Sequence, residues 1–450
     1  MMASIPLHRL LADGRAAEHP VCHDGARVVP WREFAARVAA CRDVFAAREE
    51  TRWLLVSDDA LDFAVRLLAL LHAGKQPVIP PNSRPGTLNE LAGAFDAVAD
   101  MEMPAMAARS SLAPLDPRSA TIDIFTSGSA GQPKQVRKTL NQLEAEIGTL
   151  ESLWGDRVGD AAVVSTAPCQ HFYGMLFRLL WPLSAGRPFD RVTCAHPDSL
   201  AERLALLGNT VLVSNPAHLA RLPELVALAT LQPPPRLVFS SGGPLPAAAA
   251  AIFHRDMGAA PTEVFGSTET GGIAWRRQEP DDAWTRMPGM LVAAAEDGAL
   301  LLCSPFLETG AATPWRADDA VEILPDGRFR LRGRLDRVVK IEEKRVSLPS
   351  LEARLAEHPW VRASAAVPLA GRRQQLGAAL VLNGEGRAHI DRHGRRATAQ
   401  ALRRHLAAHF DAVLIPRRWR FVEQLPMNER GKLTHAAVAA LFASDAEGES

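Results

Sequence analysis

The stretch from residue 121 to 136, TIDIFTSGSAGQPKQV, constrains the fold of this chain more than any other. Its apolar start, with Ile122, Ile124 and Phe125, predicts the end of a buried strand, and a helical pattern begins at Leu140. A loop this poor in side chains lets backbone N–H groups and hydroxyls converge on an anion, with one lysine at the rim. The stretch therefore predicts a polyphosphate cradle formed by Thr126, Ser127, Gly128, Ser129, Gly131 and Lys134.

Two other interpretations of this loop are less favoured. A Walker loop needs Gly-Lys-Ser/Thr opening directly into a helix, and this stretch has a different order. A flexible Ser/Gly linker is common for such strings. Linkers seldom join a strand to a long amphipathic helix, however, and Leu143, Ile147 and Leu150 lie on one face of the helix expected here.

The composition bounds the class of protein. A chain of 450 residues suggests two or three domains, and its net charge of +0 predicts no global field that recruits nucleic acid or an anionic membrane. The sequence has no apolar run of the roughly 18 residues that a membrane span needs. Its first residues lack the apolar core of a signal peptide. Five cysteines without paired spacing are typical of a reducing compartment. We therefore expect a cytoplasmic protein without a metal cluster or a disulfide framework.

Lysine is rare in this chain. Of 51 basic residues six are lysine, and the rest are arginine. A lysine that remains among so many arginines is expected where a compact charge on a flexible stem is needed. Lys134 and Lys432 are the leading candidates on this ground.

The order of the expected elements indicates an α/β protein. Helices are expected over 31–47 and 61–73, and strands over 53–56, 77–81, 161–166 and 237–240. Such βα alternation favours a largely parallel sheet with helices outside it. After residue 337, strands expected at 365–369, 377–383 and 419–422 flank a helix at 397–410. This last part predicts a compact α+β domain.

Three further motifs follow the glycine-rich loop in a fixed order: EVFGSTETGG, GRLDRVVKIEEKRVSL and PMNERGKLTH. Together the four motifs resemble those of the adenylate-forming enzymes, which include acyl- and aryl-CoA ligases, luciferases and peptide-synthetase adenylation domains. The family's phosphate loop runs Thr-Ser-Gly-Ser/Thr-Thr-Gly-x-Pro-Lys-Gly, from which Ala130 and Gln135 depart mildly. The resemblance implies a large N-terminal domain of mixed, largely parallel sheets with flanking helices over 1–335. It also implies a smaller, mobile α+β domain over 336–450 that rotates about a hinge at Asp336.

The resemblance also implies roles for single residues, with ATP and Mg²⁺ as cofactors. Thr268 would donate to the α-phosphate, Glu269 would hold Mg²⁺, and Lys432 would neutralise charge between the acid's carboxylate and that phosphate. His171 would lie near the substrate carboxylate, and with Tyr173 would line the acyl pocket. The remaining ATP-binding positions are Ser241, Gly242, Gly243, Phe265, Gly266, Ser267, Asp319 and Arg334.

Two of these positions depart from the family pattern. Phe265 replaces a tyrosine, and can still stack on adenine without the hydroxyl. Asp319 is assigned to the ribose by counting back from the Asp326–Gly327 turn. Ala317 and Asp318 stand where the family has Thr and Gly, so the assignment depends on the register of the motif. Asp318 is the rival candidate for the ribose contact.

Three functions remain open at this point. The segment 169–189, CQHFYGMLFRLLWPLSAGRPF, resembles the adenylating enzymes of aryl-polyene pigment clusters, which implies an aryl acid transferred to a holo acyl carrier protein. A free-CoA ligase for aromatic or medium-chain acids is the alternative, although Glu343 replaces a family glycine beside the path of the thiol. A non-catalytic nucleotide-binding protein is the third, and the presence of both Glu269 and Lys432 argues against it.

Overall fold

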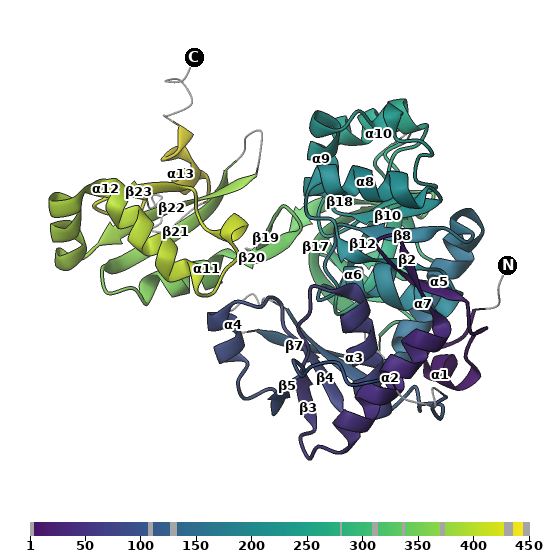
Figure 1. Cartoon of the computed structure of the whole chain (residues 1–450). Coiled ribbons are helices and arrows are strands. Elements are labelled where there is room, and N and C mark those ends of the chain that lie inside the picture. The colour runs from purple at the N-terminus through teal and green to yellow at the C-terminus, as the bar shows by residue number, and fades with distance from the viewer. Residues whose placement is uncertain are drawn as a thin grey trace. The chain divides into compact units, whose positions relative to one another are not determined.

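The computed structural model describes residues 4–106, 111–126, 133–279, 281–307, 314–334, 338–369, 374–426 and 435–443 (Figure 1). The chain divides into two compact units. Parallel strands with connecting helices make up most of the first, and the second is a smaller α+β unit, so the predicted α/β fold class is confirmed. The first unit comprises Met1–Pro81, Ala92–Phe125 and Gln135–Leu335, and the second comprises Asn82–Leu91, Thr126–Lys134 and Asp336–Ser450.

A nine-stranded sheet runs through the first unit in the order β14-β13-β12-β11-β10-β8-β9-β1-β2. Its strands from β12 to β1 are parallel, and β13, β14 and β2 pair antiparallel at the edges. The strands are β1 (Pro20–Asp24), β2 (Arg27–Pro30), β8 (Ala162–Ser165), β9 (Phe189–Thr193), β10 (Thr210–Ser214), β11 (Val238–Ser240), β12 (Thr262–Ser267), β13 (Gly271–Arg276) and β14 (Thr285–Arg286).

A five-stranded sheet in the order β5-β3-β4-β6-β7 lies in the N-terminal part. The helices α2 (Trp31–Ala46) and α3 (Ala60–His72) pack side by side and agree with the predicted helices to within a residue at each end. The strands are β3 (Arg52–Leu54), β4 (Gln76–Ile79), β5 (Ala97–Val98), β6 (Thr121–Thr126) and β7 (Lys134–Thr139).

Strand β7 was not predicted from the sequence. Its first residue, Lys134, was expected at the rim of a loop. The inward positions of this strand are Val136 and Lys138, both buried. A lysine at an inward position breaks the apolar alternation by which a half-buried strand is recognised. The strand therefore could not be read from hydrophobic periodicity.

Helix α5 (Leu140–Val158) begins where the sequence predicts it. Thr139 accepts from the Gln142 amide while the Gln142 side chain accepts from the Thr139 amide, and this capping box satisfies two backbone donors at the helix start. The buried face carries Leu143, Ile147 and Leu150, as expected from their spacing.

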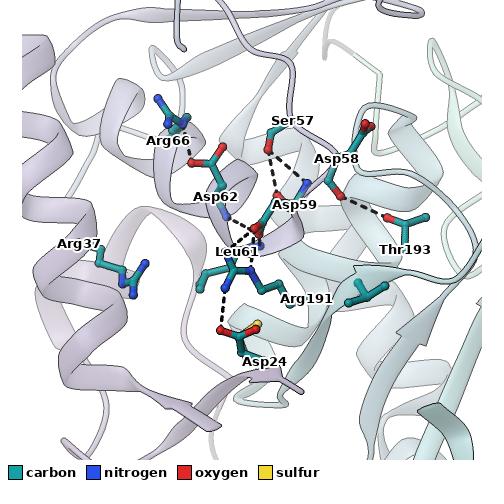
Figure 2. A network of polar contacts seen from close by, with 12 residues as sticks. Asp24, Arg37, Ser57, Asp58, Asp59, Leu61, Asp62, Arg66, Arg191 and Thr193 are labelled. Carbon is teal, nitrogen blue, oxygen red and sulfur yellow. Dashed lines mark hydrogen bonds and ion pairs between the residues drawn. The ribbon is translucent and has the colours of Figure 1, made fainter. Parts of the chain in front are cut away.

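A polar network ties the start of α3 to the nine-stranded sheet (Figure 2). The Asp59 carboxylate caps α3 by accepting from the Leu61 and Asp62 amides at 2.9 and 3.0 Å. Its second oxygen accepts from Arg191 on β9 at 2.6 Å, and Arg191 also donates to Asp24 on β1 at 2.6 Å. Asp59 thus serves at once as a helix cap and as one end of an ion-pair chain.

A four-stranded antiparallel sheet completes the first unit. Its last hairpin turns at Asp326 and Gly327, where the sequence predicts a turn, and the Gly327 φ of 82° suits glycine. One core cluster reaches from the N-terminal helices through both larger sheets to Phe329 of this sheet. The strands are β15 (Leu291–Ala294), β16 (Ala299–Cys303), β17 (Trp315–Ile323) and β18 (Phe329–Arg334).

The second unit has its own core around the three-stranded sheet β21-β22-β23 and the helices α11 (Leu348–Ala356) and α12. Helix α12 (Gly384–Ala407) starts earlier than the predicted residue 397 and breaks at Gly394, which has φ 81° and ψ 165°. The remaining elements are the hairpin β19 (Val338–Ile341) and β20 (Lys344–Ser347), the strands β21 (Val361–Leu369), β22 (Gln375–Leu382) and β23 (Arg418–Phe421), and the helices α4 (Pro85–Glu90) and α13 (His435–Ala440).

The other helices of the first unit connect strands of the nine-stranded sheet, except α1, which precedes β1. They are α1 (Leu10–Asp13), α6 (Phe172–Gly174), α7 (Trp181–Ala185), α8 (Pro197–Leu207), α9 (Pro216–Leu225) and α10 (Ala247–Met257), with a π-helical turn at Met175–Leu180. Within the described ranges, none of the helices has the length and apolar character needed to cross a membrane.

Candidate active site

Hydroxyl side chains gather where neighbouring parallel strands of the nine-stranded sheet end. Val213 on β10 pairs with Ser165 on β8, and Ser214 pairs with Ser240 on β11. The hydroxyls of Thr166 and Ser214 are 2.9 Å apart, and both residues are buried. Ligands of open α/β sheets bind outside the carboxyl ends of the strands. This edge of the sheet is therefore the candidate active site.

The predicted Thr268–Glu269 pair lies in the turn between β12 and β13, next to this edge. Ser267 and Thr270 close the turn: the Ser267 amide donates to the Thr270 hydroxyl at 3.1 Å, and the Thr270 amide donates to the Ser267 hydroxyl at 3.2 Å. Thr268 and Glu269 are half-buried between them. The turn therefore holds one hydroxyl and one carboxylate in a fixed frame.

The glycine before this turn is required by close packing. A Cβ atom at Gly266 would lie 2.2 Å from the carbonyl oxygen of Gly271 across the hairpin. The backbones of β12 and β13 therefore approach each other at a distance that only glycine permits.

The predicted adenine segment, Ser241 to Gly243, follows β11. The Ser241 hydroxyl donates to the Val264 carbonyl of β12 at 2.8 Å, and Gly242 has a φ of 91°. The segment is thus fastened to the strand that leads to Thr268 and Glu269. This brings the predicted adenine and phosphate contacts to adjacent strand ends.

Phe265 has a structural role that the sequence does not reveal. Its side chain is 6% exposed, and its ring centroid lies 5.5 Å from that of Trp284 and 6.1 Å from that of Phe329. A ring packed in this way has little open face for a base. Stacking of adenine on Phe265 stays a prediction.

Asp319 and Arg334, the two residues predicted to reach the ribose, are opposite each other in the ladder between β17 and β18. Asp319 is half-buried, whereas its rival Asp318 is exposed. Neighbouring residues of a strand point to opposite faces, so only one of the two aspartates can share a face with the core. The exposure favours Asp319.

His171 and Tyr173 stand at the junction after β8. The His171 amide donates to the Pro168 carbonyl at 3.2 Å, and its side chain is half-buried. The Tyr173 ring packs 4.8 Å from that of Phe177. Its hydroxyl lies near the Ser214 backbone but makes no hydrogen bond of ordinary geometry within the described part of the chain. Burial raises the pKa of Tyr173 well above its usual value.

The helical segment after Tyr173 belongs to the core, as the sequence predicts, since Met175, Leu176, Leu179 and Leu180 are buried. Among them lies a fully buried Arg178. It donates to the Thr193 hydroxyl at 2.6 Å and to the Asp190 carbonyl at 3.0 Å, and so fixes this segment to the end of β9.

Several predicted site residues lie outside the described residues. These are Ser127, Gly128, Ser129 and Gly131 of the phosphate loop, the hinge residue Asp336 and the catalytic candidate Lys432. The two ends of the loop belong to the second unit, where the Thr126 hydroxyl donates to the Lys134 carbonyl at 3.4 Å. The roles of all these residues stay predictions.

Two charged residues close to the turn escaped the sequence analysis. Lys138 is 1% exposed, and burial lowers its pKa. Glu146 is 2% exposed, and burial raises its pKa to about 7, although the Gly272 amide and Lys138 oppose the shift. The rarity of lysine could have drawn attention to Lys138. Glu146 occupies an ordinary helical position, and no pattern in the sequence distinguishes it.

Comparison with known proteins identifies the family. Residues 88–296 match the AMP-binding enzyme family, and residues 350–432 match its C-terminal domain. A 4-coumarate–CoA ligase of Rhodobacter capsulatus is 32% identical over 311 residues, which is 68% of this chain and 73% of that protein. Phenyloxazoline synthase MbtB of Mycobacterium tuberculosis is 26% identical over 374 residues, which is 74% of this chain and 26% of that protein.

A solved structure shares the fold. The amide bond synthetase McbA of Marinactinospora thermotolerans superposes with a TM-score of 0.82 at 19% identity, covering 97% of this chain and 100% of that one. The motifs, the strand-end site and the matches over both parts of the chain agree. The chain therefore belongs to the AMP-binding enzyme family, and the enzyme class predicted from its sequence, an AMP-forming acid–thiol ligase, is confirmed.

Proposed function

We propose that the enzyme activates an aryl carboxylic acid and transfers the acyl group to the phosphopantetheine thiol of an acyl carrier protein. The acid's carboxylate attacks the α-phosphorus of ATP and expels pyrophosphate. The thiol then attacks the acyl carbon, releases AMP and loses its proton. The observation that carries the proposal is the turn at the carboxyl edge of the sheet, which offers Thr268 and Glu269 together.

The residues at this turn fit a magnesium ion. Mg²⁺ prefers one or two carboxylates together with phosphate oxygens and waters, and the half-buried Glu269 would supply one carboxylate. The bound ion would neutralise phosphate charge as two anions meet. Thr268 would donate to the α-phosphate, and Asp319 would accept from the ribose hydroxyls. Lys432 would neutralise charge between carboxylate and phosphate.

The aromatic residues after β8 support an aryl acid as substrate. Tyr173 supplies an aromatic ring whose hydroxyl is buried there, and Phe177 packs behind it in the core. A buried hydroxyl without a partner costs about 1 to 3 kcal/mol. A polar substituent on the substrate ring would recover this cost. The same feature supports selection between aryl acids by a hydrogen bond to Tyr173.

Glu343 supports a carrier protein over free CoA as the acceptor. It lies in the turn between β19 and β20 of the second unit, and one of its carboxylate oxygens is buried without a hydrogen bond among the described residues. In the family, a glycine at this position borders the path of the thiol. A carboxylate there would repel the phosphates of free CoA. Similarity to a 4-coumarate–CoA ligase favours CoA as the acceptor, so a free-CoA ligase is the second candidate.

The test is a screen of acid-dependent ATP–pyrophosphate exchange with aromatic and fatty acids, using wild type and Lys432→Ala. Loss of one donor to the transition state costs roughly 3 to 4 kcal/mol, or 10² to 10³ in rate. We therefore expect exchange with an aromatic acid in the wild type and near-complete loss in the variant, while ATP binding by calorimetry persists. Absence of exchange with every aromatic acid, beside exchange with a fatty acid, would contradict the proposed aryl substrate. Full exchange in Lys432→Ala would remove that residue from the mechanism.

A further inference from the structure

Lys138 is joined to the turn that carries Glu269. Its ammonium donates to the carbonyl oxygen of Glu269 at 2.7 Å and to that of Phe306 at 3.4 Å. Gln142, one turn further along, donates to the same Phe306 carbonyl at 3.2 Å. The ammonium also lies 5.8 Å from the ring centroid of Phe172, next to His171, within reach of a cation–π contact.

Glu146 fastens the other end of the same turn. It lies one helical turn after Gln142 on α5, and its carboxylate accepts from the Gly272 amide at 2.7 Å. The glycines there leave room for this carboxylate, since a Cβ atom at Gly271 would lie 2.5 Å from Glu146 Oε2. The turn is therefore held at a carbonyl on one side by a buried ammonium, and at an amide on the other side by a buried carboxyl group.

We infer that Lys138 and Glu146 are positioning residues of the adenylation reaction, which set how the turn presents Thr268 and Glu269 to the magnesium–nucleotide complex. The inference rests on the proposed function, and specifically on the role of Glu269. Two buried charges are a costly way to stabilise a fold, because apolar residues of similar volume often do so equally well. Their benefit is a defined geometry for the backbone that they bind.

The choice of lysine at position 138 agrees with this role. Arginine makes up 45 of the 51 basic residues, so lysine stands here against a strong bias. An ammonium on a slender stem can donate to two carbonyls from a site that is 1% exposed. The planar fork of arginine needs more room and presents its donors in a fixed plane.

The test uses the full-length enzyme with Lys138→Met, which keeps the length of the side chain and removes the charge. Two quantities are measured: the Mg²⁺ concentration for half-maximal pyrophosphate exchange, and the calorimetric affinity for a non-hydrolysable ATP analogue with and without Mg²⁺. We expect a half-saturating Mg²⁺ concentration at least about tenfold higher, and a reduced gain in nucleotide affinity on adding Mg²⁺, with affinity in the absence of Mg²⁺ unchanged. Lys138→Arg should restore folding without restoring the Mg²⁺ response.

Two reference variants separate the possible causes. Leu143→Ala, on the same helix, destabilises the core without touching the turn, and should leave the Mg²⁺ response unchanged at a temperature where it is folded. Glu269→Gln reports on the proposed function itself. If Glu269→Gln shifts the Mg²⁺ response and Lys138→Met does not, the inference fails while the proposed function stands. If the wild type is active and Glu269→Gln has the same half-saturating Mg²⁺ concentration, Glu269 does not hold the metal. The inference about Lys138 and Glu146 is then rejected as well.

Glu146→Gln covers the case in which Lys138→Met does not fold. Glutamine keeps an acceptor for the Gly272 amide and removes the charge opposite Lys138. We expect an intermediate shift in the Mg²⁺ response, in the same direction as that of Lys138→Met. A folded Glu146→Gln enzyme with the wild-type response would overturn the assignment for this residue.

Discussion

At the scale of single residues, Glu146 makes the stability of the first unit depend on pH. Burial raises its pKa from 4.5 to about 7, so the folded protein binds this proton more tightly than the unfolded chain does. This contribution to stability is fully present below pH 4.5 and is lost as the pH rises through 7. The free energy of unfolding changes by about 3 kcal/mol, since each pKa unit corresponds to roughly 1.4 kcal/mol.

Glu146→Gln should abolish this dependence. We expect the melting temperature of the wild type, relative to the variant, to fall as the pH is raised from 5 to 8. Thermal unfolding followed across this range measures the difference. Glu202→Gln, at an exposed position of α8, is the control and should follow the wild type at every pH. Parallel curves for the wild type and Glu146→Gln would show that Glu146 does not titrate in this range.

Candidate residues could be found from the sequence where a motif fixes their spacing, and they stayed hidden where only the fold brings residues together. The motif with Thr268 and Glu269 is visible in the sequence, and the structure places these two residues in a turn between two strands at the sheet edge. Lys138 and Glu146 are 131 and 126 residues away from the backbone groups that they bind. No local pattern records contacts at such separations, and the rarity of lysine led to Lys134 and Lys432 rather than to Lys138.

At the scale of elements, the N-terminus of α3 depends on one carboxylate with two tasks (Figure 2). Asp59→Ala removes both the helix cap and the ion pair with Arg191, whereas Asp59→Asn keeps a capping oxygen and loses the ion pair. A cap is worth about 1 kcal/mol, and a partly exposed ion pair up to about 1 kcal/mol. We expect Asp59→Ala to destabilise by roughly 1 to 2 kcal/mol and Asp59→Asn by less than half of that. Equal losses in the two variants, measured by urea unfolding, would place the whole effect in the ion pair.

Elements with regular apolar spacing were predictable, and those whose inward positions are polar or whose glycines interrupt the pattern were not. Helices α2, α3 and α5 begin within a residue of their expected starts. Strand β7 was missed because Lys138 faces inward. The first half of α12 was missed because it contains few apolar residues and ends at Gly394.

At the scale of the whole molecule, the net charge of +0 conceals a separation of charge. Residues 336–450 contain 19 basic and 13 acidic residues, a net +6, and residues 1–335 contain 32 basic and 38 acidic residues, a net −6. A positive C-terminal part attracts anionic acceptors of either kind, CoA or an acidic carrier protein. Overall charge therefore does not discriminate between the two acceptors, and a local group must do so.

Glu343 is the local group that we expect to discriminate. Its carboxylate lies in a hairpin turn of this positive part and is partly buried. It would repel the several phosphates of free CoA more strongly than a carrier-bound arm, which has one phosphate held outside by the carrier's own surface. We expect the wild type to form thioester faster on a holo carrier protein than on CoA, and Glu343→Gly to improve kcat/KM for CoA at least about tenfold at low salt with unchanged pyrophosphate exchange. The gain should shrink at high ionic strength, because screening weakens repulsion between separated charges. Efficient transfer to CoA by the wild type, with no turnover on any carrier protein, would instead establish the enzyme as a free-CoA ligase.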